Sequence, residues 1–182
     1  MSHNHRLCAA FALAALSLGS NASIADSPQA STWHHHHAAF TYFGITAFYS
    51  CDGLEGKVSQ ILLFLGARHD LRVQADGCAR GGSSPSRIVS VTVDFDTLSA
   101  ASDAPAADIV QANWTPFKLD ADRPFFMGQG DCELIRAMQP MLTQDFSLRR
   151  LDYSVSCTPH QLSIADFRVQ GEVLKSSAAH SG

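Results

Sequence analysis

The sequence predicts one α+β domain in which two tandem β-α-β-β units form a sheet with two helices on one face. Three observations support this prediction: two amphipathic segments with helical period, several segments with strand-like alternation, and four cysteines at matching places in the two halves. Apolar residues make up 46 % of the 182-residue chain and charged residues 16 %, which is the balance of a globular domain rather than of a disordered chain.

Residues 1–25 are typical of a secretory signal peptide. A positively charged start precedes an apolar run, residues 7–19, that is too short to cross a bilayer as a stable helix. Ser23 and Ala25 provide the small side chains of a cleavage site, so Asp26 is the expected first residue of the mature chain. An N-terminal helix buried in the domain is the alternative. We expect a periplasmic or secreted protein without stable membrane insertion after cleavage.

The rest of the chain divides into a lead-in, one domain and a short tail. Residues 26–39 are polar without a period and are expected to form a flexible, histidine-containing lead-in. The single α+β domain is expected over residues 40–176, with halves at 40–98 and 112–176. Residues 177–182 are the expected C-terminal tail.

The sequence of the first half predicts the element order strand, helix, strand, strand. Residues 38–50 favour a central strand, because both faces of this aromatic and β-branched segment are apolar. A helix follows, with Asp52 and Glu55 in a capping-box arrangement at its start and Gly66 as its stop. Its apolar stripe consists of Leu54, Val58, Ile61, Leu62 and Leu65. Alternating residues then predict strands over 71–75 and 89–95, the second with Val89, Val91, Val93 and Phe95 on its buried face.

The second half repeats this order. Residues 113–119 are an expected strand, and residues 151–157 and 161–174 are the last two. Asp131 can cap the helix between them, whose apolar side consists of Leu134, Ile135, Met138, Met141 and Leu142. The likeness favours an internal repeat, although two ordinary α+β halves can also be alike by chance.

The cysteines support disulfides rather than a metal site. Of the five in the sequence, Cys8 lies in the signal peptide and leaves Cys51, Cys78, Cys132 and Cys157. An even number in an exported chain indicates two disulfides, and four cysteines allow three pairings. Their repeated positions favour Cys51–Cys78 and Cys132–Cys157. A structural zinc site usually has closely spaced cysteine pairs, which this sequence lacks.

The four consecutive histidines, His34, His35, His36 and His37, are the candidate metal ligands. Imidazole binds zinc and copper; we expect no cofactor, with one of these two metals as the alternative. The alternative is a polar lead-in with weak, adventitious affinity, because a built site needs ligands fixed by outer hydrogen bonds. His69 and His160 could complete a site if the fold brings them close.

The acidic residues do not assign a catalytic site. Asp94 and Asp96 share the polar face of one expected strand, where they are either an acid–base pair or part of a solvated surface. Asp131 and Glu133 flank Cys132, and both are explained by helix capping and by the helix dipole. The sequence contains no G-x-S-x-G turn, so no catalytic residue is assigned.

The function that we expect is that of an exported, non-enzymatic domain that binds a protein or an envelope component, for instance by adding a partner strand to a sheet edge. Metal binding through the histidine run is the first alternative, and a hydrolase with a carboxylate pair is the second. The net charge of −4 gives no basic surface, which argues against a nucleic-acid partner.

Residues 48–55 (FYSCDGLE) with the helix that follows, and residues 131–134 (DCEL), carry one resemblance. On these segments the chain resembles small signal-bearing proteins of Gram-negative bacteria that have no assigned activity. The resemblance implies export and implies no functional residue.

Overall fold

The structure, a computed structural model, describes residues 27–78, 87–102, 105–160 and 166–177. The expected signal peptide lies outside these residues, as does nearly all of the expected tail. The first half consists of β1 (Gln29–Phe43), α1 (Cys51–Phe64), β2 (Arg72–Asp76) and β3 (Ile88–Ala100). The second half consists of β4 (Val110–Asp120), α2 (Cys132–Asp145), β5 (Leu148–Ser156) and β6 (Asp166–Ser176). Short 3-10 turns, η1 (Ala106–Asp108) and η2 (Gln129–Asp131), precede β4 and α2.

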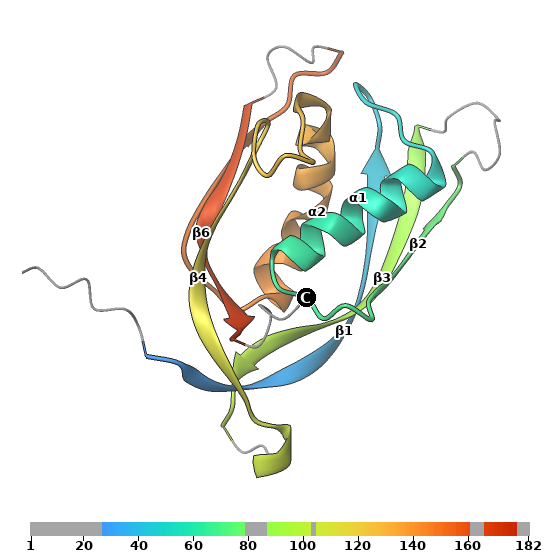
Figure 1. The fold of residues 1–182 in the computed structure, drawn as a ribbon. Coiled ribbons are helices and arrows are strands. Elements are labelled where there is room, and N and C mark those ends of the chain that lie inside the picture. The colour runs from blue at the N-terminus through green and yellow to red at the C-terminus, as the bar shows by residue number, and fades with distance from the viewer. Residues whose placement is uncertain (1–26, 79–86, 103–104, 161–165, 178–182) are drawn as a thin grey trace, which may run out of the picture.

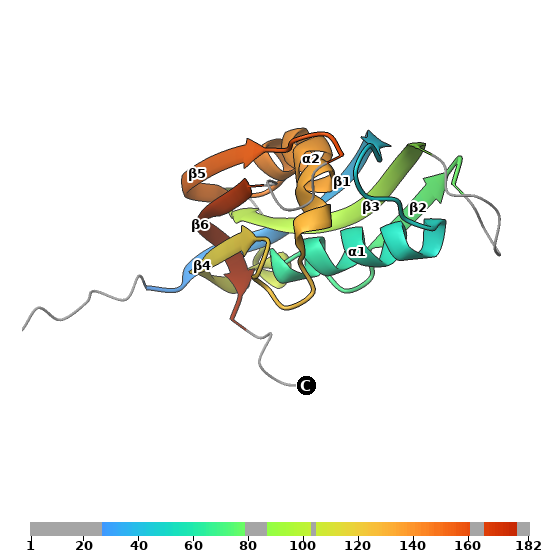
Figure 2. The ribbon, with the colours of Figure 1, turned by 90° about the horizontal axis from the view of Figure 1, so that it is seen from above.

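The strands form one antiparallel sheet in the order β2-β3-β1-β4-β6-β5. Both helices lie on the same side of this curved sheet, α1 across β2 and β3 and α2 beside β1 (Figure 1). Figure 2 shows, from above, that the two halves of the sheet meet at an angle that contains the helices. The α+β prediction, with its repeated element order and its helices on one face, is therefore confirmed.

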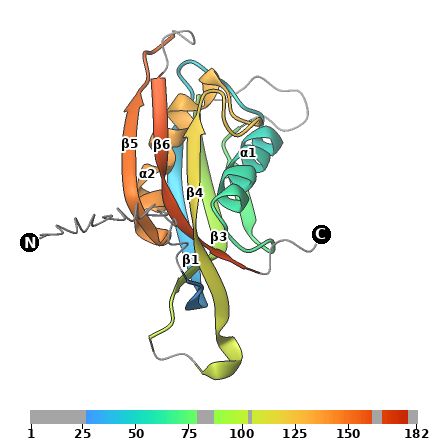
Figure 3. The same ribbon diagram turned by 60° about the vertical axis from the view of Figure 1, so that its left-hand side comes forward.

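The two halves are joined by a short strand contact. β1 pairs with β4 only over Gln29–Ser31, whereas it pairs with β3 along the whole of β3. A small apolar cluster on the outer face, away from the helices, covers this junction and is formed by Leu98, Ala112 and Leu174 with Trp33, Val110 and Trp114 packed against it. Beyond the junction, β6 is the only strand of the described residues that pairs with β4, so no described strand lies along the other edge of β4 (Figure 3).

The core lies between the sheet and the helices. The apolar sets predicted for the two helices and for β3 are buried, and they form one cluster with Tyr42, Leu119, Phe167 and Val169. The alternation in β3 places Ser90, Thr92 and Asp94 on the opposite, outer face, as predicted.

The histidine run is part of a strand and not of a flexible lead-in. The structure corrects this expectation because β1 begins at Gln29, and residues 31–43 pair with β3 in continuous antiparallel register. The predicted strand over residues 38–50 ends early, at Phe43, and Tyr42 fixes the following turn by donating to the carbonyl of Ala47 at 2.7 Å. A polar strand can form here because β3 pairs with its backbone along residues 31–43 and supplies side-chain partners for three imidazoles.

The start of α1 differs from the predicted capping box. Ser50 is the N-cap and accepts a hydrogen bond from the Gly53 amide at 3.1 Å, while Glu55 accepts from the Ala75 amide of β2 at 2.9 Å. The carboxylate thus links the helix to the sheet instead of closing its own first turn. Gly66 has a φ of +95°, which confirms the predicted glycine stop.

A close approach of β5 to β6 requires another glycine. The register of these strands shifts between Arg149 and Asp152, where β5 has a bulge. A Cβ atom on Gly171 would lie 3.0 Å from the carbonyl oxygen of Arg149 and 3.2 Å from the Cα of Leu151. A side chain at this position would require the β5 backbone to move away by a few tenths of an ångström.

Both predicted disulfides are confirmed. Cys51 is bonded to Cys78 across 27 positions and Cys132 to Cys157 across 25 positions, with Cα–Cα distances of 5.3 and 5.7 Å. Each bond fastens the start of a helix to the chain just after the next strand. None of the helices in the described part of the chain is long and apolar enough to cross a membrane.

Reduction of the disulfides should lower the free energy of unfolding, because each bond removes conformational entropy from the unfolded chain. For loops of this length the expected loss is about 3–4 kcal/mol per bond. Thermal melts with and without reductant measure it, and the Cys51→Ser/Cys78→Ser variant should melt below the wild type without reductant. Equal melting temperatures of the oxidised and reduced wild type would contradict a stabilising role.

Candidate functional site

Cross-strand pairs of histidine and aspartate lie on the outer face of the sheet. The Nδ1 atom of His35 lies 2.9 Å from Asp96 Oδ1, and that of His37 lies 2.7 Å from Asp94 Oδ1. The register places the partners directly opposite each other on β1 and β3. The hydrogen bond from His37 lowers the pKa of Asp94, so this carboxyl is ionised at neutral pH and the Nδ1 atom carries the proton.

Two arginines extend this polar face towards β2. Arg68 donates to both carboxylate oxygens of Asp70 at 2.8 Å and also contacts Asp96. These contacts raise the pKa of Arg68, chiefly through Asp70, and lower the pKa of Asp70. An open pocket of about 340 Å³ lies here, and it is lined by His35, Arg68, Asp70, Arg72, Asp94, Phe95 and Asp96.

The other face of β1 holds the remaining histidines of the run. His36 Nε2 lies 2.9 Å from the hydroxyl of Thr97, and its Nδ1 lies 3.6 Å from Asp145 Oδ1. Thr97 donates its only hydroxyl proton to the carbonyl of Asp145 at 2.6 Å. The imidazole must therefore donate to Thr97, which is the reverse of what a general base does for a nucleophile.

The strand thus divides the predicted metal ligands into two pairs on opposite faces. His35 and His37 lie on the outer face, and His34 and His36 lie on the other. Neither His69 nor His160 joins them, because the described residues contain no group of three or more histidine, cysteine, aspartate or glutamate side chains placed to hold one ion.

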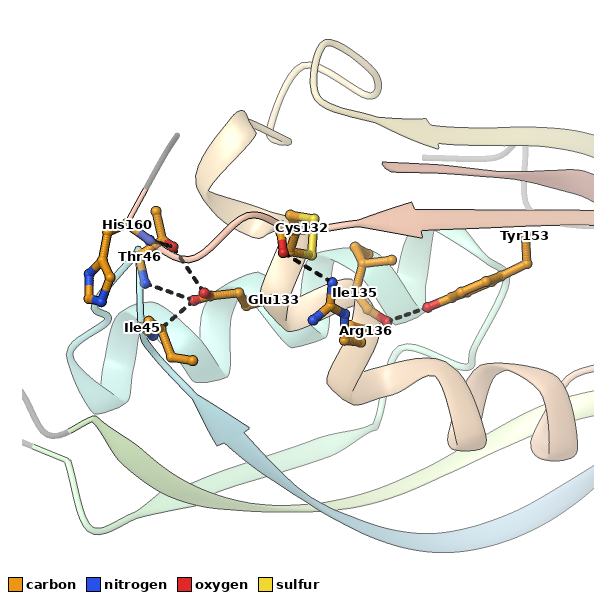
Figure 4. Close-up of a disulfide and its surroundings, with 9 residues drawn as sticks. Ile45, Thr46, Cys132, Glu133, Ile135, Arg136, Tyr153 and His160 are labelled. Atoms are coloured by element: carbon orange, nitrogen blue, oxygen red, sulfur yellow. Dashed lines mark hydrogen bonds between the residues drawn. A yellow bond between two sulfur atoms is a disulfide. The ribbon is translucent and has the colours of Figure 1, made fainter. Parts of the chain in front are cut away.

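Glu133 fastens the β1–α1 loop to the start of α2. Its carboxylate accepts from the amides of Ile45 and Thr46 at 2.9 and 3.0 Å and from the Thr46 hydroxyl at 3.0 Å. The same hydroxyl accepts from the His160 amide, in the segment that follows β5 (Figure 4). The capping role predicted for Glu133 is replaced by this link between the halves, which lies beside the Cys132–Cys157 disulfide.

Asp131 is a buried acceptor rather than a side-chain cap of α2. It is 3 % exposed and accepts from the Tyr49 hydroxyl, from the Gly128 amide at 2.7 Å and from Lys57 Nζ at 3.1 Å. Lys57 also donates to the carbonyl of Phe126. This cluster joins α1, the β1–α1 loop and the loop before α2. Sequence reasoning missed it because its members are far apart in the chain.

The loop before α2, residues 121–128, is ordered but presents a fully exposed aromatic side chain. Phe125 is 95 % exposed, more than any other large hydrophobic residue that the structure describes. The loop is held by reciprocal backbone hydrogen bonds between Asp120 and Arg123 and by a bond from the Met127 amide to Pro124 at 2.8 Å. A phenylalanine that is exposed on a hydrogen-bonded loop is available for contact with another molecule.

An apolar pocket of about 400 Å³ lies next to this loop. It is lined by Phe64, Pro116, Phe117, Lys118, Arg123 and Pro124. The ring of Phe126 connects it to Phe125, since its centroid lies 5.8 Å from that of Phe125 and 6.1 Å from that of Phe64. We call Phe125 and the pocket the Phe125 surface.

Two basic residues, Lys118 and Arg123, line the pocket of the Phe125 surface. Lys118 forms an ion pair with Asp120. The guanidinium of Arg123 has no hydrogen bond or ion pair with the residues that the structure describes. Its side chain lines the apolar pocket, and a guanidinium can donate two parallel hydrogen bonds to a carboxylate.

Replacing Asp131 by alanine should lower the free energy of unfolding by about 3 kcal/mol, because Lys57 and the Tyr49 hydroxyl would lose their buried acceptor. Asp122→Ala is the matched control, since Asp122 lies exposed in the same loop and should change stability by less than about 0.5 kcal/mol. Denaturant unfolding of both variants measures the difference. Similar free energies of unfolding for the two variants would show that Asp131 is not the centre of this cluster.

The three tyrosines should resist ionisation in the folded protein. Burial raises the pKa of Tyr153 to about 12, and it raises the pKa of Tyr42 and of Tyr49 further. Because the folded pKa values exceed those of the unfolded chain, this contribution to stability is complete below pH 10 and is lost as the pH rises through 12 and above. Tyrosinate absorbance should be absent from the native protein at pH 10 and present in guanidinium; equal titration curves would contradict the burial.

Comparison with known proteins does not assign a role to these features. Models of protein families, curated proteins and solved structures give no significant match to the chain. The resemblance expected from residues 48–55 and 131–134 therefore stays a prediction, and function is inferred from the geometry.

Proposed function

We propose that the chain is an exported, non-catalytic domain that binds another protein through the Phe125 surface. The observation that carries this proposal is a fully exposed aromatic residue on an ordered loop beside an apolar pocket. Interfaces are usually anchored by aromatic and arginine side chains at a pocket, and this surface offers both Phe125 and Arg123. The expected partner inserts an apolar side chain into the pocket and places an acidic group beside Arg123.

Export is part of the same proposal. The signal-like residues 1–25 and the two disulfides both favour an oxidising compartment, the periplasm or the outside of the cell. We also propose that the two halves are an internal repeat. Their element orders agree, and the strand order β2-β3-β1 of the first half has its counterpart in β5-β6-β4 of the second.

Recognition by a side-chain surface fits this sheet better than the addition of a partner strand. The edge strand β2 has only 5 residues, and the edge strand β5 is interrupted by its bulge. The free edge of β4 contains Pro116, which has no amide hydrogen to donate. Short strands, bulges and prolines are the features by which proteins prevent strands from pairing at an edge.

A second candidate function is metal binding by the histidine run. The observation that favours it is the pair of carboxylates that hold His35 and His37 on the outer face. Hydrolysis by Asp94 and Asp96 is less well supported. Each carboxylate already accepts from a histidine, and Asp96 is also bound by Arg68.

Phe125→Ala should weaken partner binding without affecting the fold, because the side chain is 95 % exposed and does not belong to the core. Photo-crosslinking from position 125 in cells of the native host identifies the partner, and titration of the purified partner measures its affinity. We expect a loss of about 2 kcal/mol, roughly 30-fold, for Phe125→Ala, and a smaller loss for Arg123→Ala.

Phe48→Ala is the matched control, because Phe48 is 45 % exposed on another ordered loop, between β1 and α1. Its affinity for the partner should equal that of the wild type. Equal effects of the two substitutions, or none from either, would refute the Phe125 surface. If position 125 crosslinks to lipid alone, and if binding to phosphatidylglycerol vesicles depends on Phe125, then the binding partner is the envelope surface and not a protein.

A further inference from the structure

His35 and His37 are positioned as a pair on the outer face of β1. Residues two apart on a strand point to the same side, and their Cα atoms are about 6.6 Å apart. The side chains are 68 % and 65 % exposed, so solvent reaches both rings. Two exposed imidazoles at this spacing can approach one ion together.

Each ring is held through the nitrogen that is not needed for metal binding. Nδ1 of His35 is bonded to Asp96, and Nδ1 of His37 is bonded to Asp94. A carboxylate that accepts from Nδ1 leaves Nε2 as the unprotonated nitrogen of the neutral ring, with its lone pair available. Metal-ligating histidines in proteins typically donate their other ring nitrogen to a carboxylate in this way.

The charges around the pair favour a cation. Three carboxylates, those of Asp70, Asp94 and Asp96, face two guanidinium groups, those of Arg68 and Arg72, in the adjoining pocket. With neutral imidazoles the group therefore carries one net negative charge. Arg68 shares Asp96 with His35, and its positive charge is offset by its two hydrogen bonds to Asp70.

We propose that His35 and His37 bind one divalent transition-metal ion through their Nε2 atoms, with Asp96 and Asp94 orienting the rings. The ligand set is two imidazoles, with water in the remaining positions. Imidazole sites bind copper(II) most tightly among the divalent first-row ions, followed by nickel(II) and zinc(II). This inference rests on the second candidate function and does not depend on the Phe125 surface.

The structure separates this pair from the other two histidines of the run. His36 donates to Thr97 on the helix side of the sheet, and His34 lies on that side as well. A flexible run would use all four imidazoles interchangeably. In a strand, His35 and His37 lie on one face and His34 lies on the other. Substitutions on the two faces should therefore change the metal affinity differently, which an experiment can detect.

Copper(II) titration of the full chain without an affinity tag, with its disulfides intact, tests the proposal. The His35→Ala/His37→Ala variant gives the baseline from histidines elsewhere, including His3 and His5. Calorimetry and copper absorbance should show one additional equivalent in the wild type. Each single substitution, His35→Ala or His37→Ala, should weaken this equivalent by at least about 10-fold, and Asp94→Ala should weaken it by about 10-fold through loss of ring orientation.

His34→Ala is the matched control, since it removes an imidazole from the same run but from the other face. It should leave the affinity unchanged. A loss equal to that of His37→Ala, or a double variant that binds as much copper as the wild type, would overturn the site. Thermal melts without metal show whether each variant is folded, and His37→Gln replaces His37→Ala if the latter is not. Partner crosslinking from position 125 should be unaffected by these substitutions, so the two proposals fail separately.

Discussion

The antiparallel register between β1 and β3 is the constraint on which the rest of the structure depends. It covers all 13 residues of β3, and it places the apolar side chains of the main core, such as Tyr42 of β1 and Val93 of β3, towards the helices. A shift by one residue would expose Val91, Val93 and Phe95 and would bury Asp94 among apolar groups. The buried valines and the histidine–aspartate pairs on the opposite face therefore specify the same alignment. Because the packing of the inner face and the hydrogen bonds of the outer face require the same register, the polar strand β1 pairs with β3 in one alignment.

The union of the two halves depends on side chains more than on strand pairing. Only Gln29–Ser31 of β1 pairs with β4, so few backbone hydrogen bonds cross the junction. Asp131 and Glu133, on either side of Cys132, provide the additional links, because they bind the β1–α1 loop and α1. The same links hold the segment that precedes α2. Part of the loop that presents Phe125 is thus held by the side chains that join the halves, since Gly128 donates to Asp131 and Lys57 donates to the carbonyl of Phe126.

The sequence predicts the parts of this fold that are encoded locally. Both helices, the strand over 89–95 and the disulfide pairing follow from periodicity and from the matching positions of the cysteines. The strand character of His34–His37 could not be predicted, because four identical polar residues have no alternation until β3 assigns them to two faces. The partners of Asp131 and Glu133 were missed for a similar reason, since capping is a local explanation and the actual donors lie about 75–90 positions away.

The histidine–aspartate pairs on the outer face support metal binding by the histidines and oppose acid–base catalysis by the aspartates. An acid–base pair needs carboxylates that can exchange protons with a substrate, but Asp94 and Asp96 are both acceptors from cross-strand histidines. The interaction that restrains the carboxylates also directs Nε2 of each imidazole away from its partner. The carboxylates lose proton-transfer capacity here, whereas each Nε2 keeps a lone pair that can act as a base or as a metal ligand. The strand pairing therefore argues against a catalytic carboxylate pair and supports the proposed metal ligands, on the face of the sheet opposite the helices and independently of the apolar pocket beside α1.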